Sequence, residues 1–247
     1  VGLGGVEGMP LRVVLRADGE NGVVLRSPSL WSAAPGASAA RSLASETETD
    51  PAAVRPNILI YLIDTLRRDH LGVYGFERPV SPQIDAFAEG ATVYEDAVGQ
   101  STWTKPAVAS MFTGVWPPVH GATGWKHKLP ENLASLPEVL QGAGYRTGAV
   151  VANPNIVRDF GFARGFDDFT RVLKRPSPQL NEIVFDWLEN ADDRPFFLYV
   201  HTMDPHAPYR PPEPWLSRFA PRTSEMPTWT PSWRWPLEAL PFLLDLY

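Results

Sequence analysis

The apolar stretch from Asn57 to Ile63 constrains the fold more than any other feature of the chain. It is an uninterrupted run rich in Ile, Leu and Tyr, too short to span a membrane and of the right length for a strand buried on both faces of a parallel sheet. Asp64 ends the run, and in open α/β sheets ligands bind beyond the carboxyl ends of the strands. Asp64 is therefore placed to face a metal or a substrate. The alternative is that Asp64 or Thr65 caps a short helix over residues 67–71.

Strand-like and helix-like segments alternate through the rest of the chain. Strands are predicted over residues 92–97, 146–152 and 195–201, and helices over 82–89, 105–112, from 136 onward and over 177–189. The last of these helices has its apolar residues on one face: Leu180, Ile183, Val184, Trp187 and Leu188. Such alternation predicts an α/β fold, namely a doubly wound, mostly parallel sheet with helices on both faces.

The chain divides into three segments. Residues 1–31 contain two β-prone runs joined by turn residues, which predicts a β-hairpin left from a preceding domain. Residues 32–54 have almost nothing to bury and are interpreted as a linker. Residues 55–247 contain the alternating strands and helices, and the Trp- and Pro-rich piece over 211–236 within them is interpreted as an insertion or lid.

Composition excludes several classes of function. The 247 residues carry a net charge of −6, which argues against a nucleic-acid groove, and no apolar run is long enough to span a membrane. There is no Cys, so disulfides and thiolate metal sites are excluded. The chain begins with Val, and its localisation stays open.

A second stretch, from Ser101 to Gly114, places a hydroxyl at the start of a helix. Thr104 precedes the helix predicted over 105–112, with Pro106 in its first turn. Thr104 could be a helix cap, because Thr is favoured there. Alternatively, the exposed amides and the positive dipole end of the helix hold an anion against the Thr104 hydroxyl. The two interpretations are compatible.

Together, RPNILIYLIDTLRRDHLG and STWTKPAVASMFTG resemble the sulfatase family of the alkaline phosphatase superfamily. That family opens with a strand like PNILLI followed by Asp and a DHLG-like segment. Its nucleophile has Pro two residues later and Thr-Gly nine and ten residues later, a spacing that Thr104, Pro106, Thr113 and Gly114 keep. Further similar pieces follow in order, among them ARGFDDF and PFFLYVHTMDPHAPY. The resemblance implies an alkaline phosphatase-like fold, truncated at its C-terminus, with residues 55–247 as the N-terminal portion of a sulfatase-like catalytic domain.

The resemblance also implies roles for individual residues. Asp64 would be a metal ligand, with Thr65 at the neighbouring metal position, and Thr104 would be the nucleophile. His206 lies at the family's PHxPY-like position, where a His contacts the ester or protonates the leaving oxygen. Lys105 and His201 are candidates for substrate binding, although an exposed Lys in the first helical turn is the commoner arrangement. The metal would be a divalent cation, Ca²⁺ or Mg²⁺ by preference, with Zn²⁺ or Mn²⁺ as alternatives.

Three departures from the family pattern bear on the reaction. Many sulfatases have a second Asp where this chain has Thr65, and an Arg where it has Val108. Their nucleophile is a formylglycine made from Cys or Ser, and Thr104 cannot yield that aldehyde, so no formylglycine is expected. A Thr ester is cleaved only when water attacks it. Chemistry through a Thr ester is better precedented for phosphoryl than for sulfuryl groups in this superfamily, so Thr104 favours a phosphate or phosphodiester substrate.

The leading hypothesis is therefore a metal-dependent hydrolase of sulfate or phosphate esters. The alternatives are a phosphotransferase with Thr104 as the covalent carrier, and an inactive truncated domain that only binds. The substrate would be a small-molecule, glycan or lipid ester. The family completes its metal site beyond the point where this chain ends, so the chain is expected to be a fragment that binds metal poorly. All of this requires Asp64 and Thr104 to converge on one spot.

Overall fold

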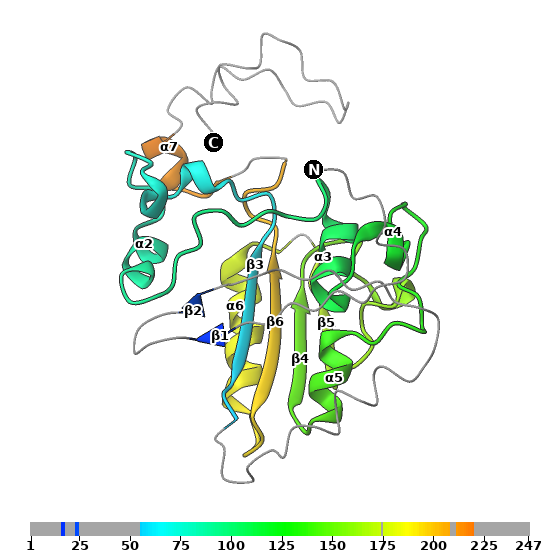
Figure 1. Cartoon of the computed structure of the whole chain (residues 1–247). Coiled ribbons are helices and arrows are strands. Elements are labelled where there is room, and N and C mark those ends of the chain that lie inside the picture. Colours follow the sequence, from blue (N-terminus) through cyan, green and yellow to red (C-terminus); the bar gives the residue numbers. More distant parts are fainter. Residues whose placement is uncertain (1–15, 18–22, 25–54, 174, 208–210, 220–247) are drawn as a thin grey trace. The chain divides into compact units, whose positions relative to one another are not determined.

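The computed structural model describes residues 16–17, 23–24, 55–173, 175–207 and 211–219 (Figure 1). The chain divides into two units, residues 1–54 and 55–247. In the first unit β1 (Arg16–Ala17) and β2 (Val23–Val24) pair antiparallel, as the predicted hairpin requires. The turn of that hairpin, the predicted linker and most of the predicted lid lie outside the described residues.

The second unit contains a four-stranded parallel sheet. Its strands follow the spatial order β3-β6-β4-β5, as Figure 1 shows. Their bounds are Ile58–Ile63 for β3, Arg146–Val151 for β4, Asp168–Arg171 for β5 and Phe196–Thr202 for β6. Three of the predicted strands are confirmed, and β5 was not predicted. The strand predicted over residues 92–97 is wrong, because this segment is an exposed turn with no sheet partner in the described part of the chain.

Helices and 3₁₀ turns connect the strands. The helices are α2 (Pro82–Ala88), α3 (Thr104–Thr113), α4 (Pro117–His120), α5 (Leu136–Gly142), α6 (Ser177–Glu189) and α7 (Trp215–Phe219). Short 3₁₀ turns occupy Arg68–His70, Gly72–Tyr74 and Arg158–Phe160. Local signals set these bounds: Ser135 and Glu138 form a capping box at α5, and Gly114 ends α3 with a φ of 68°. None of the helices in the described ranges is long and apolar enough to cross a membrane.

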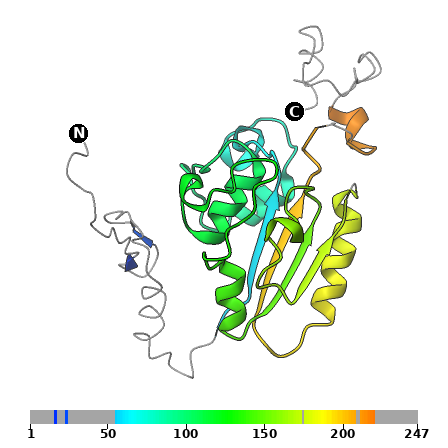
Figure 2. The same ribbon diagram turned by 90° about the vertical axis from the view of Figure 1, so that its right-hand side faces the viewer.

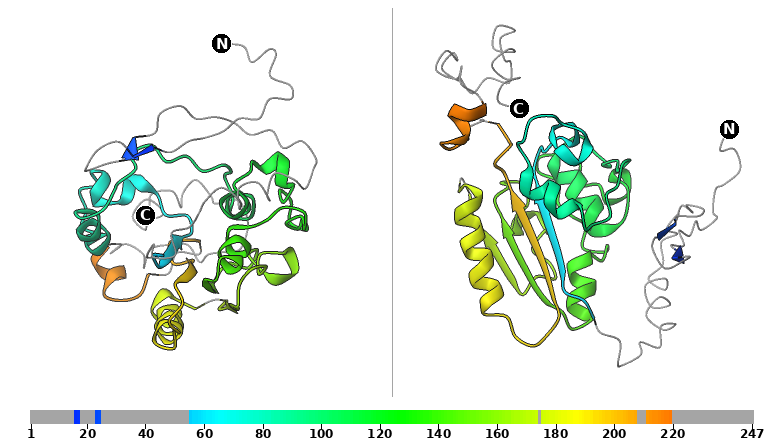
Figure 3. Two further views of the ribbon diagram at one scale, coloured as in Figure 1. Left: turned by 60° about the horizontal axis from the view of Figure 1, so that its bottom comes forward. Right: turned by 90° about the vertical axis from the view of Figure 1, so that its left-hand side faces the viewer.

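The sheet lies between two helical layers. Figures 2 and 3 show α6 on one side and α3, α4 and α5 on the other. Under α3 the core includes Val108, Phe112 and Tyr199, and under α6 it includes Leu180 and Val184. The predicted apolar face of the 177–189 helix packs against the sheet as expected. The predicted doubly wound α/β architecture is therefore confirmed.

The first strand differs from the prediction in its burial. Leu59 and Tyr61 are 54% and 42% exposed, so β3 is not buried on both faces. The reason is its place in the sheet: β3 lies at the edge and pairs only with β6 in the described structure, whereas α6 packs over β4 and β6. The apolar run correctly predicted a parallel strand but not its position in the sheet.

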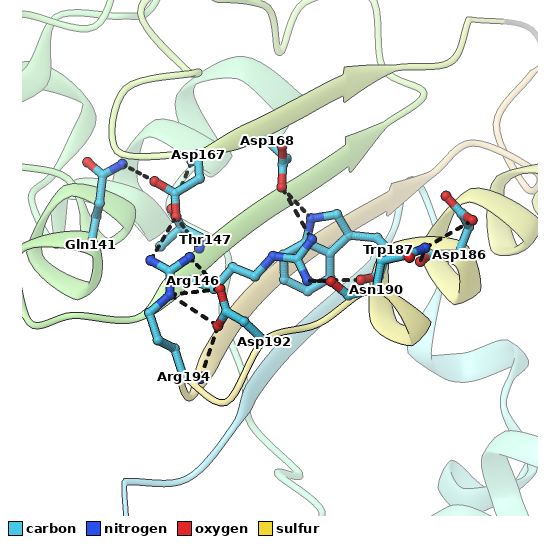
Figure 4. Close-up of polar contacts among 10 residues, drawn as sticks. All are labelled: Gln141, Arg146, Thr147, Asp167, Asp168, Asp186, Trp187, Asn190, Asp192 and Arg194. Atoms are coloured by element: carbon cyan, nitrogen blue, oxygen red, sulfur yellow. Dashed lines mark hydrogen bonds and ion pairs between the residues drawn. The ribbon is translucent and has the colours of Figure 1, made fainter.

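A polar network at the amino-terminal end of β4 fastens α6 to the sheet, as Figure 4 shows. The Arg146 guanidinium carbon lies 4.0 Å from the Trp187 ring centroid. The same guanidinium donates hydrogen bonds to the carbonyls of Trp187 (3.1 Å) and Asn190 (2.9 Å). The Trp187 indole N–H in turn donates to Asp168 at 2.8 Å. The network therefore ties the end of α6 to β4 and β5.

We expect Arg146→Ala to lower the free energy of unfolding by about 1–3 kcal/mol, because it removes a stacked, largely buried cation and leaves two carbonyls without donors. Urea unfolding followed by circular dichroism measures the change. Arg194→Ala is the matched control: the Arg194 side chain is 49% exposed in its ion pairs with Asp167 and Asp192 (Figure 4), and solvent screens such pairs, so its removal should have the smaller effect. Equal effects of the two substitutions would contradict this assignment.

Candidate functional site

A cavity opens at the carboxyl ends of the strands, where a ligand site is expected in an open α/β sheet. Its volume is about 500 Å³. Its walls come from the end of β3, from the segment leading into α3, from the first turns of α3 and from the loop after β6. The residues that line it include Ile63, Asp64, Thr65, Thr104, Met111 and His206. The cavity therefore brings together segments that are far apart in the sequence.

Asp64 sits directly beyond β3 and is only 7% exposed. Its backbone N–H donates to the carbonyl of Thr202 at 3.0 Å, which extends the ladder between β3 and β6 by one residue. Its Oδ2 accepts hydrogen bonds from Asn153 Nδ2 at 2.7 Å and from His201 Nε2 at 3.1 Å. Burial alone would raise the pKa of Asp64, but the hydrogen bonds from His201, Asn153 and Thr104 outweigh burial and lower the pKa. Asp64 is therefore held as a carboxylate.

Thr104 is the first residue of α3, and its hydroxyl points to Asp64. Its Oγ1 lies 3.1 Å from Asp64 Oδ2 and 3.4 Å from Oδ1. Trp103, not Thr104, occupies the N-cap position, so the capping alternative does not hold. The first amides of α3, those of Thr104 and Lys105, have no acceptor within the helix. The expected convergence of Asp64 and Thr104 is confirmed by these distances.

Thr65 and His206 line the same cavity. Thr65 is exposed and has a φ of 58°, a left-handed conformation that is costly for a residue with a Cβ and that turns the chain sharply after Asp64. His206 Nδ1 lies 2.7 Å from the carbonyl oxygen of Ala207. Since a carbonyl can only accept, Nδ1 carries the hydrogen and Nε2 is the nitrogen left for a ligand. The roles of both residues stay predictions.

Lys105 differs from the prediction. The residue is fully buried, and its ammonium donates to the carbonyls of Trp125 (2.6 Å), His127 (3.2 Å) and Gly124 (3.3 Å). It also lies 3.4 Å from the centroid of the Phe160 ring, and burial lowers its pKa. An ammonium has three donors, and all three are used here. The expectation of an exposed side chain was therefore wrong, and these contacts favour holding the 124–127 loop over binding a substrate.

His201 also lies elsewhere than a substrate-binding role requires. It has no exposed surface and is not part of the cavity wall, because its imidazole lies behind Asp64 and donates to it. Asn153, which sequence reasoning missed, holds Asp64 in the same way and is 2% exposed. The signal was available: Asn153 follows β4 at the carboxyl edge of the sheet, as Asp64 follows β3.

The donors that could bind a divalent metal are few. Among the residues that the structure describes, Asp64 Oδ1 has one long contact, with Thr104. A carboxylate and a hydroxyl are oxygen donors of the kind that Ca²⁺ and Mg²⁺ prefer. Nevertheless, the described residues contain no group of three His, Asp or Glu side chains placed to hold an ion. Two oxygen donors fall short of the six or so that these cations take. The described residues by themselves therefore do not complete a metal site.

We expect the 247-residue chain to bind Ca²⁺, Mg²⁺, Zn²⁺ and Mn²⁺ weakly, with dissociation constants no tighter than about 10⁻⁴ M, the range of sites with few charged ligands. Isothermal titration calorimetry of each metal into the chain tests this, with Asp64→Asn as the control for binding at the site. Tight one-to-one binding that the substitution removes would overturn the prediction.

Comparison with known proteins supports the sequence interpretation. The family model described as Sulfatase matches residues 56–233. Human N-sulphoglucosamine sulphohydrolase is 29% identical over 184 residues, which cover 68% of this chain and 37% of the human protein. An ulvan-active sulfatase of Formosa agariphila is 25% identical over 159 residues, covering 63% and 31% of the two chains.

Solved structures share the fold. The phosphonate monoester hydrolase of Agrobacterium radiobacter superposes with a TM-score of 0.60 at 19% identity, over 68% of this chain and 44% of that one. The C-terminal periplasmic domain of EcEptC from Escherichia coli, solved in complex with Zn, gives a TM-score of 0.55 at 20% identity, over 80% and 56%. The chain thus spans well under two thirds of the proteins that it matches.

Proposed function

Because the chain belongs to the sulfatase family, we propose that it carries part of the active site of a hydrolase of sulfate or phosphate esters, with Thr104 as the nucleophile. The observation that carries this proposal is the 3.1 Å hydrogen bond from Thr104 Oγ1 to Asp64 Oδ2 in the wall of the cavity. A nucleophile held by a carboxylate at the start of a helix suits attack on a tetrahedral anion.

The proposed reaction has two steps. Thr104 Oγ1 attacks the sulfur or phosphorus atom while the bond to the ester oxygen breaks. His206 Nε2 accepts the hydroxyl proton of Thr104 and passes it to the ester oxygen, which leaves as an alcohol. Water then cleaves the Thr104 ester and releases sulfate or phosphate. The lowered pKa of Asp64 makes it a weak base, so we assign it to orienting the Thr104 hydroxyl. A divalent cation would supply positive charge against the anion, and the remaining ligands of its coordination shell would come from outside the described residues.

Two features favour a phosphate or phosphodiester over a sulfate ester. Thr104 cannot become a formylglycine, so the covalent intermediate must be cleaved by water. In addition, Val108 stands where sulfatases have an Arg, and it is 2% exposed in the core beneath the cavity. The named relatives include sulfatases, and the structural neighbours include a phosphonate monoester hydrolase, so both chemistries occur on this fold.

Two alternatives remain open as proposals. A phosphotransferase would pass the group from Thr104 to an acceptor alcohol in place of water. A binding domain without activity would hold the anion at the start of α3 and release it unchanged, which the incomplete set of metal donors in the described residues favours. The substrate in each case is a small-molecule, glycan or lipid ester.

Parallel assays separate these functions. We would measure p-nitrophenyl sulfate, p-nitrophenyl phosphate and bis(p-nitrophenyl) phosphate with this chain and with any longer protein that carries it. Faster turnover of the phosphorus esters supports the proposed preference, and faster turnover of the sulfate reverses it. Adding glycerol distinguishes transfer from hydrolysis, because a transferase yields glycerol phosphate. Absence of turnover in every sample would favour the binding domain.

A further inference from the structure

A buried line of hydrogen bonds runs behind the cavity to Asp64. The phenol oxygen of Tyr199 lies 2.8 Å from His201 Nδ1, and His201 Nε2 lies 3.1 Å from Asp64 Oδ2. Tyr199 and His201 are two residues apart on β6, so both side chains project from the same face of that strand. Both residues are fully buried. No step of the proposed reaction uses Tyr199 or His201, so their arrangement needs another explanation.

The direction of these hydrogen bonds follows from the phenol. Within the described part of the chain, the Tyr199 hydroxyl has no hydrogen-bond partner other than His201. If the phenol accepted from Nδ1–H, its own hydrogen would be buried without an acceptor, at a cost of about 1–3 kcal/mol. Burial and the nearby Asp64 charge hold the pKa of Tyr199 well above its usual value, so the hydroxyl keeps its hydrogen. The phenol therefore donates to Nδ1.

The tautomer of His201 follows in turn. With Nδ1 accepting from Tyr199, the ring hydrogen lies on Nε2 and is donated to Asp64 Oδ2. The opposite tautomer would set the Nε2 lone pair against a carboxylate oxygen, which is repulsive. Asn153 adds a second donor to the same oxygen. Thr104 Oγ1 is a third donor to Oδ2, at 3.1 Å, whereas the one contact of Oδ1 among the described residues is the longer 3.4 Å approach of the same hydroxyl.

We propose that Tyr199 and His201 are positioning residues: Tyr199 fixes His201 as the Nε2–H tautomer, and His201 holds Asp64 so that Oδ1 is the oxygen available to a ligand. The consequence for catalysis rests on the proposed function, whereas the direction of the hydrogen bonds does not. The two can therefore fail separately.

The tautomer is measured directly by ¹⁵N–¹H correlation spectra of the imidazole rings in the histidine-labelled chain, which has five His residues. His201→Gln identifies the His201 signals by their loss. We expect the intact chain to show His201 as the Nε2–H tautomer with a slowly exchanging ring hydrogen. We expect Tyr199→Phe to speed that exchange and to move the Nδ1 resonance of His201, because Nδ1 loses its hydrogen bond, with the other four rings unchanged. Tyr145→Phe, at another buried Tyr just before β4, should change none of them.

Several results would overturn the inference. An Nδ1–H tautomer in the intact chain would do so, as would an unchanged His201 ring in a folded Tyr199→Phe variant. In a protein with measurable turnover, Tyr199→Phe should lower kcat about 10- to 100-fold at constant KM, as for other residues that orient a ligating side chain. A change in KM alone would contradict positioning. If the protein shows no turnover but His201 is the Nε2–H tautomer, the result would count against the proposed function and not against the positioning of His201.

Discussion

Replacing Thr104 by Ala should abolish ester hydrolysis, with a loss in kcat/KM of at least about 10³-fold, because removal of a covalent nucleophile leaves only binding and electrostatic assistance. The hydroxyl is the group that links the cavity to Asp64, at 3.1 Å from Oδ2. The rate of p-nitrophenol release from the preferred ester measures the loss. Thr104→Ser should retain part of the activity, because Ser keeps an oxygen at the same place.

The matched control is Thr102→Ala. Thr102 lines the same cavity two residues earlier, is exposed, and forms no hydrogen bond to Asp64 in the structure. We expect this variant to keep activity within about threefold of the unmodified protein, as is usual for an exposed residue outside the reacting groups. Turnover that survives Thr104→Ala, or that both substitutions reduce equally, would remove Thr104 from the mechanism.

Phe112→Ala should cause the largest loss of stability, about 3–5 kcal/mol in the free energy of unfolding. Phe112 is 2% exposed on α3, and its ring centroid lies 5.0 Å from that of Tyr199, 5.9 Å from that of Phe166 and 6.3 Å from that of Phe162. Truncation leaves a cavity beneath the helix that carries Thr104. Urea unfolding monitored by circular dichroism gives the change in free energy.

Phe185→Ala serves as the control for the same change of side chain on a helix. Phe185 lies on α6 and is 59% exposed, so its removal should change the free energy of unfolding by less than about 1 kcal/mol. A similar loss from both substitutions would mean that the aromatic cluster under α3 is not the main source of stability at this site.

Local patterns of apolar residues in the sequence predicted most of the helices and strands. The 3.6-residue spacing of Leu180 and Val184 predicted α6 and its buried face, and the apolar run before Asp64 predicted β3. The strand β5 was missed, since Asp168–Arg171 is short and mostly polar. It forms a strand because it pairs in parallel with β4. Sheet pairing between distant segments is not encoded in the periodicity of either one.

The site could be predicted only in outline. Asp64 and Thr104 stand at a strand end and a helix start, where ligands bind in parallel sheets, and the resemblance to the sulfatase family singled them out. The environment of each side chain was not visible. Lys105 was expected near the substrate or in solvent, yet it is buried against three carbonyls from a loop about twenty residues later.

The sequence by itself determined most of the strand and helix segments, the sulfatase family, and the identity of the carboxylate and the hydroxyl, because each depends on residues close together in the chain. Only the tertiary structure decided that Asn153, His201 and Thr104 share one carboxylate, and that Tyr199 lies behind it. The three contacts to Asp64 join residues 40, 89 and 137 positions apart. Such contacts form when separate strands and helices pack together, and packing depends on the whole fold.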